Sequence, residues 1–172
     1  ADGLNRFRAG EEVLNTSQDN ESLLLKGTFR FLDDHQLDLG YMRYDSTYGE
    51  IMPSQIMESQ QGAFQTYLDR VVMNTYTAKY RWNPTENDLF DLKINARMTD
   101  TELYKSLPAN LDGNVGRRYG VNVENRSIFD TAWGDLSLNY GGAYTYETLV
   151  PADGADLIRG RDGDRREVNA FI

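Results

Sequence analysis

The chain has 172 residues, a formal net charge of −9 at pH 7, no cysteine and a mean hydropathy of −0.63. The acidic balance argues against a nucleic-acid partner, because such partners attract clustered Lys and Arg. The missing cysteines exclude disulfides, thiol catalysis and Cys-ligated metals within the chain, and no apolar run approaches the ~20 residues of a membrane-spanning helix.

Residues 22–32 form the first predicted strand, because apolar and polar side chains alternate along them. Leu23, Leu25 and Phe29 fall on one set of positions, and Lys26 and Arg30 on the other. A period of two is the period of a β-strand, in which successive side chains point to opposite faces. The same pattern predicts a second strand over residues 37–48, after a tight turn at 33–36.

The fourth predicted strand, 89–102, has the clearest alternation. Leu92 and Ile94 alternate with Lys93 and Arg97 along it. Related patterns predict a third strand over 74–82, a fifth over 119–129 and a sixth over 136–148, and a seventh begins near Arg166.

The connections between these strands alternate in length. Short turns are predicted at 33–36, 83–88 and 130–135, and long polar stretches at 49–73, 103–118 and 149–165. Outer-membrane β-barrels have short periplasmic turns and long extracellular loops. We therefore expect the short turns at one end of the sheet and the long loops at the other.

Aromatic residues gather near the predicted strand ends, where a membrane strand would leave the lipid. The alternative is that aromatic residues are simply common in strands. Near the short turns these residues are Trp82, Phe90, Phe129 and Trp133, and toward the long loops they are Tyr41, Tyr44, Tyr48, Tyr104, Tyr119, Tyr144 and Tyr146.

The predicted fold class is all-β, an antiparallel transmembrane β-barrel segment of about six to seven strands, and residues 1–172 form part of one barrel domain. Such barrels have at least eight strands, so we expect the chain to be part of a longer polypeptide. A soluble β-sandwich is the competing fold. In the barrel, Phe29, Leu92, Ile94, Leu138 and Tyr140 are expected to face lipid, and Lys26, Arg30, Lys93, Arg97 and Asn139 the lumen.

Several stretches resemble the barrel of TonB-dependent outer-membrane receptors, and within them the heme/hemoglobin receptor group. They are SLLLK (22–26), NTYTAKYRWNP (74–84), DLFDLK (88–93), GR (160–161) and RREVNAFI (165–172).

This resemblance implies a 22-stranded barrel in the outer membrane of a Gram-negative bacterium. It further implies a plug domain, energy supplied by TonB, and import of heme from a hemoprotein or hemophore caught by the outer loops. Neither the plug nor a TonB-contacting segment is found in these residues. A siderophore receptor of the same superfamily, a passive porin and a barrel adhesin are the alternatives.

No catalytic set of residues is recognised, so the chain is not expected to be an enzyme. His35 could ligate heme iron, but its predicted turn lies away from the long loops, which favours a structural or solvated role. The acidic residues Asp153, Asp156, Asp162 and Asp164 lack the spacing of a calcium loop. We therefore expect no metal ligand and no bound cofactor here, with heme as the transported substrate.

The predicted loop 49–73 is the strongest candidate for partner binding. It is rich in Gln and Met and carries Met57, Phe64 and Tyr67. Flexible thioethers and aromatic rings favour protein interfaces over metal cages. These three residues are the predicted contacts for a carrier protein, although the loop could equally just shield the barrel mouth.

Overall fold

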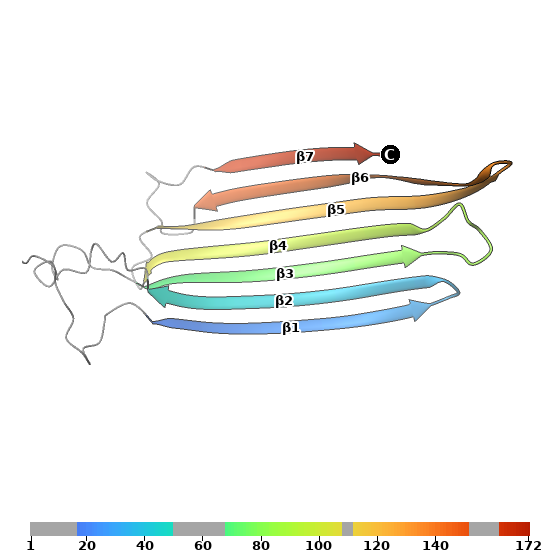
Figure 1. The fold of residues 1–172 in the computed structure, drawn as a ribbon. Coiled ribbons are helices and arrows are strands. Elements are labelled where there is room, and N and C mark those ends of the chain that lie inside the picture. Colours follow the sequence, from blue (N-terminus) through green and yellow to red (C-terminus); the bar gives the residue numbers. More distant parts are fainter. Residues whose placement is uncertain (1–16, 50–67, 108–111, 152–161) are drawn as a thin grey trace, which may run out of the picture.

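The computed structural model describes residues 17–49, 68–107, 112–151 and 162–172, which form one antiparallel sheet of seven strands. Each strand pairs with its neighbours in the chain, in the order β1-β2-β3-β4-β5-β6-β7 (Figure 1). This confirms the all-β antiparallel fold. The strands are β1 (Gln18–Phe31), β2 (His35–Gly49), β3 (Leu68–Trp82), β4 (Leu92–Leu107), β5 (Asp112–Thr131), β6 (Gly134–Pro151) and β7 (Gly163–Phe171).

All seven predicted strands are present, but most extend further than predicted. β3 begins at Leu68 rather than at residue 74, and β5 begins at Asp112 rather than at residue 119. The residues added to β3 (68–73) mix apolar side chains with Asp69 and Arg70, and those added to β5 (112–118) are mostly polar or glycine, so neither stretch alternates regularly. The ladder hydrogen bonds that hold them belong to the backbone. Alternation of hydropathy therefore could not reveal these strand ends.

The expected topology is confirmed. The connections Leu32–Asp34, Asn83–Asp91 and Ala132–Trp133 lie at one end of the sheet, which we call the turn end. The strand ends on either side of the other three connections lie at the opposite end of the sheet, which we call the loop end (Figure 1).

The prediction of a long loop over residues 103–118 is wrong. β4 continues to Leu107 and β5 starts at Asp112, so only residues 108–111 connect them. This connection is shorter than Asn83–Asp91 at the turn end, so long and short connections do not alternate strictly. The loop was overestimated because Lys105, Arg117 and Arg118 read as loop residues, although they lie within paired strands.

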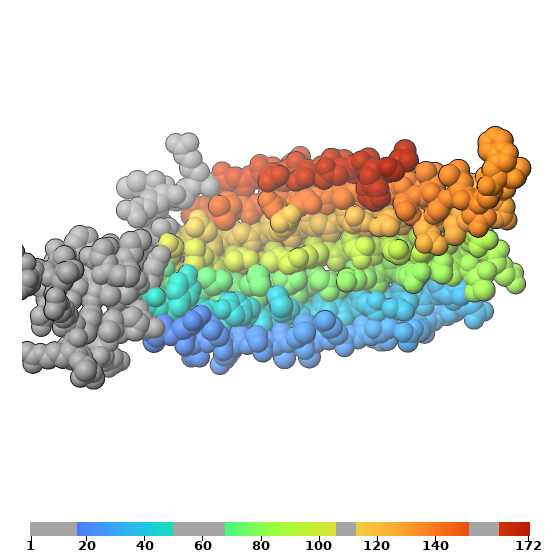
Figure 2. All heavy atoms as spheres, viewed as in Figure 1, coloured from blue at the N-terminus to red at the C-terminus, as the bar shows by residue number. Residues whose placement is uncertain are grey.

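The described residues form a single layer without a hydrophobic core. Val72 is the buried hydrophobic side chain among them, at 6% exposure. Figure 2 shows the strands side by side, with no second layer of described residues over the face in view. The described residues also contain no helix long and apolar enough to cross a membrane.

Candidate functional site

The register of the strands assigns every residue to one of two faces, because directly paired residues share a face. We call the face that carries Ile94 the apolar face and the face that carries Lys93 the polar face. One row of paired residues on the apolar face runs through Phe29, Leu37, Tyr80, Ile94, Val123 and Gly142.

The predicted division into faces is confirmed by this register. Phe29, Leu92, Ile94, Leu138 and Tyr140 all lie on the apolar face. The five residues expected on the opposite face all lie there: Lys26, Arg30, Lys93, Arg97 and Asn139.

A row of four tyrosines and one methionine marks the border of the apolar face toward the loop end. We call it the tyrosine row. The rings of Tyr41 and Tyr76 lie 5.0 Å apart, and the Tyr41 hydroxyl donates a hydrogen bond to Asn74 Oδ1 at 2.9 Å. Asn74 is two residues closer to the loop end, so this ring points its polar end away from the apolar band. The row consists of Tyr41, Tyr76, Met98, Tyr119 and Tyr146.

The aromatic predictions for this border were only partly right. Tyr41, Tyr119 and Tyr146 are in the tyrosine row. Tyr44 and Tyr48 lie on the polar face, since their pairing partners do. Sequence reasoning missed Tyr76, because only the register of β2 with β3 brings it beside Tyr41.

The opposite border, at the turn end, is also aromatic. The Trp82 ring stacks on Phe90 at a centroid distance of 5.2 Å and on His35 at 5.8 Å. His35 also stacks on Phe31 at 5.7 Å, and its Nδ1 is 2.7 Å from the Tyr80 hydroxyl. His35 is thus not in a turn as predicted, because it is the first residue of β2. Its ring is held between aromatic neighbours.

Beyond the tyrosine row, the same face becomes charged. The Asp45 carboxylate accepts hydrogen bonds from Arg70 at 2.7 and 2.8 Å and from Arg43 at 2.9 Å. The hydrogen bonds from Arg70 in particular lower the pKa of Asp45 below its usual value of 3.8. Asp100 and Arg117 form a second ion pair at 3.4 Å. The apolar face is therefore a band that ends in charge at the loop end.

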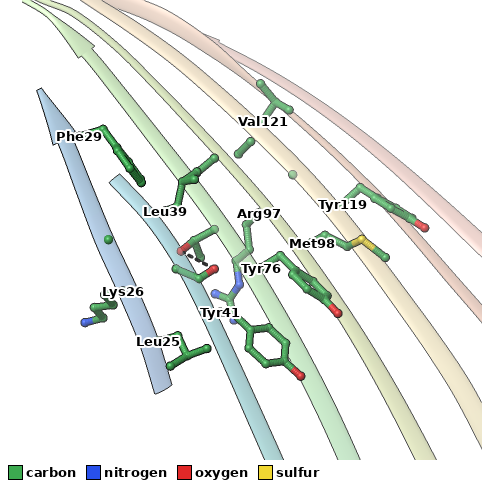
Figure 3. A pocket seen from close by; sticks show the side chains of 16 residues that line it. Leu25, Lys26, Phe29, Leu39, Tyr41, Tyr76, Arg97, Met98, Tyr119 and Val121 are labelled. Carbon is green, nitrogen blue, oxygen red and sulfur yellow. Dashed lines mark hydrogen bonds between the residues drawn. The ribbon is translucent and has the colours of Figure 1, made fainter. Parts of the chain in front are cut away.

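A hollow of about 720 Å³ lies in the middle of the apolar face (Figure 3). Its floor has the small residues Gly27, Ala78 and Ala96. Larger apolar residues of the neighbouring strands pair with these residues and lie between and beside them. Figure 3 shows Phe29, Leu39 and Val121 toward one side of it, and Tyr41, Tyr76, Met98 and Tyr119 toward the other.

Near the turn end, a polar cluster interrupts the apolar face. The Leu89 carbonyl accepts hydrogen bonds from Asn125 Nδ2 at 2.9 Å and from Ser127 Oγ at 2.8 Å. Asn125 Nδ2 also lies 2.9 Å from the Tyr140 hydroxyl. Leu89 precedes β4, where the regular ladder has not yet begun. The two side chains therefore satisfy a carbonyl that would otherwise be left without a partner.

The polar face carries ion pairs near the turn end, and Asp91, the residue just before β4, takes part in two of them. Asp91 pairs with Arg81 at 2.9 Å and with Lys93 at 3.8 Å. A hollow of about 440 Å³ on this face is lined by Arg97 and by Asn122, among others. The Asn122 Oδ1 atom is buried and has no hydrogen-bond partner among the described residues.

The predicted partner-binding residues Met57, Phe64 and Tyr67 lie outside the described residues, as do Asp153 and Asp156. Asp164 forms an ion pair with Arg166 at 3.6 Å. Within the ranges that the structure covers, no group of three or more His, Cys, Asp or Glu residues could hold a metal ion.

Comparison with known proteins shows that the chain is similar to part of a receptor. The chain is similar to a protein of Acinetobacter baumannii named Hemophilin receptor, with 32% identity over 167 residues. The match covers 86% of this chain but only 15% of the length of that receptor. No family model and no solved structure matches the chain.

Proposed function

We propose that the sheet is part of the wall of an outer-membrane β-barrel, with its apolar face toward lipid and its polar face toward the lumen. A sheet with one apolar face must cover that face, and no described residue packs against it. Aromatic borders on two sides of the apolar band fit the interfaces of a bilayer. In a closed barrel, β1 and β7 would pair with further strands, which would leave no open edge in lipid.

The complete protein, in this proposal, is a receptor that imports heme, taken up free or from a carrier protein. The observation that carries this step is the similarity of most of the chain to part of the Hemophilin receptor. The resemblance to TonB-dependent receptors supplies the rest: a plug inside the barrel and energy from TonB. The chain itself contributes wall and outer connections, and it catalyses no reaction.

Growth on heme tests this function. The complete polypeptide would be expressed in a Gram-negative host that lacks its own heme receptors, with heme as the sole iron source. Growth should depend on the polypeptide and should stop when TonB is deleted from the host. Growth without TonB would favour a passive porin, and growth on a ferric siderophore but not on heme would favour a siderophore receptor.

A further inference from the structure

The hollow on the apolar face is suited to a hydrocarbon guest. It has a volume of about 720 Å³ and is widely open to the outside, so a guest would lie along the face with one side uncovered. The two buried side-chain atoms without a hydrogen-bond partner in the described residues belong to Asn122 and Asn125, and neither residue lines this hollow. A guest therefore needs no polar group to satisfy the site, and an apolar chain would gain from leaving water.

The borders of the apolar band indicate what kind of guest occupies the hollow. A protein interface is usually an apolar patch with a polar rim around it. Here the aromatic borders lie only toward the turn end and the loop end. Between them, the band continues across the strands to the sheet edges, where Leu25 of β1 and Val168 of β7 are exposed. A band that is open at both edges fits a layer of lipid better than a second protein.

We propose that the hollow is a binding site for one acyl chain of an outer-membrane lipid. The acyl chain lies over Ala78 and Ala96, beside the tyrosine row. This inference rests on the proposed membrane function, and it goes beyond general contact with lipid. Because the side chains of the floor are small, the acyl chain fits between Phe29 and Tyr76. It stays in contact with the protein longer there than acyl chains elsewhere on the apolar face.

Two valines provide a matched comparison. Val121 and Val168 lie in the same row of the apolar face, since both pair with Tyr144. Val121 lines the hollow and Val168 does not. Val168 is 77% exposed and Val121 only 44%. Labelling by freely moving lipid would therefore give Val121 no advantage over Val168, whereas an ordered acyl chain in the hollow would favour Val121.

The experiment places the complete protein in vesicles of phosphatidylethanolamine and phosphatidylglycerol, part of which carries a diazirine on its acyl chain. After illumination, mass spectrometry measures lipid attached at the two valines. We expect several-fold more label at Val121 than at Val168. Ala96→Phe, which fills the hollow, should bring Val121 down to the level of Val168, and Val168→Phe should leave Val121 unchanged.

Three results would overturn the proposal that the hollow holds an acyl chain. Labelling that follows exposure would mean that no chain is held, although the face still meets lipid. Strong labelling of Val121 that Ala96→Phe does not change would mean that the hollow is not the cause. Absence of label on the whole apolar face would also contradict the proposed barrel wall. If Ala96→Phe does not insert into the vesicles, Ala78→Leu fills the same hollow with less added volume.

Discussion

Ile94 and Asn95 are neighbours in β4, but they lie on opposite faces. An Arg at the middle of the lipid-facing surface costs ~2–4 kcal/mol, whereas an Arg in a hydrated lumen costs much less. Ile94→Arg should therefore strongly reduce the folded protein recovered from the outer membrane, and Asn95→Arg should reduce it little. Urea unfolding in vesicles measures the difference. Equal losses for the two variants would contradict the assignment of the faces.

Asn125 and Asn122 allow a second matched test, because they lie on one strand but make different contacts. Asn125→Leu should destabilise the sheet by about 1–3 kcal/mol, since its amide hydrogen-bonds the Leu89 carbonyl. Asn122→Leu should cost less, because the Oδ1 atom that it removes has no described partner. The free energy of unfolding in urea checks both values. A larger loss for Asn122→Leu would show that the Leu89 carbonyl does not need its side-chain donors.

The Asp45 cluster predicts a dependence of stability on pH. The pKa of Asp45 is lowered in the folded state by Arg70, so the charged carboxylate stabilises the fold. This contribution is fully present above the unfolded pKa, near 3.8, and is lost as the pH falls through the lower folded value. Asp45→Asn should therefore lower stability at pH 6 and weaken the dependence on pH below about 4. Urea midpoints at several pH values measure this, and an unchanged acid dependence would contradict it.

At the residue scale, the sequence alone could predict which side chains share a face, because the alternation within a strand is local. It could not predict which residues become neighbours across strands. Asp45 and Arg70 meet only through the register of β2 with β3. The tyrosine row and the hollow over Ala78 and Ala96 likewise depend on the pairing of five strands. None of these has a signal within a single strand.

At the scale of elements, strand number, order and topology could be predicted, and strand ends could not. The central part of each strand alternates apolar and polar residues, whereas toward the loop end charged residues such as Asp45, Arg70 and Arg117 lie on the apolar face and interrupt this alternation. In β5, for example, Arg117 and Arg118 are consecutive, and each forms an ion pair, with Asp100 and Glu147 respectively. Paired backbone extends these strands past the apolar band.

The connection between β2 and β3, residues 50–67, carries the predicted partner contacts Met57, Phe64 and Tyr67. Deleting residues 54–66 from the complete protein should weaken capture of a heme carrier protein and spare uptake of free heme. Binding of the carrier to whole cells measures the first effect, and growth on free heme measures the second. A Gly-Ser segment of equal length is the control for chain length. Unchanged capture would mean that the connection only shields the barrel mouth.

At the scale of the whole molecule, the described sheet has two faces with opposite chemistry and no core between layers. A water-soluble protein with this many exposed apolar side chains would be expected to associate through them. Leu25, Phe29 and Leu136 are each 56% exposed. In our proposal, lipid covers this apolar face, and water or a plug meets the polar face. The rows of aromatic residues at both borders, and the charges beyond the tyrosine row, support this orientation.

The accessibility of residues along β4 to oxygen and to a water-soluble reagent shows which face of the sheet meets lipid. These 172 residues contain no cysteine, so single Cys variants from residue 93 to 98, made in a complete protein in which any other Cys is replaced by Ser, can carry a spin label in vesicles. Oxygen, which partitions into lipid, should relax labels at Ile94, Ala96 and Met98, and a water-soluble nickel complex should relax those at Lys93, Asn95 and Arg97. If accessibility to oxygen and to the nickel complex alternates in this way along β4, the sheet is part of the wall of a membrane barrel. A nickel complex that reaches both sets equally would contradict it.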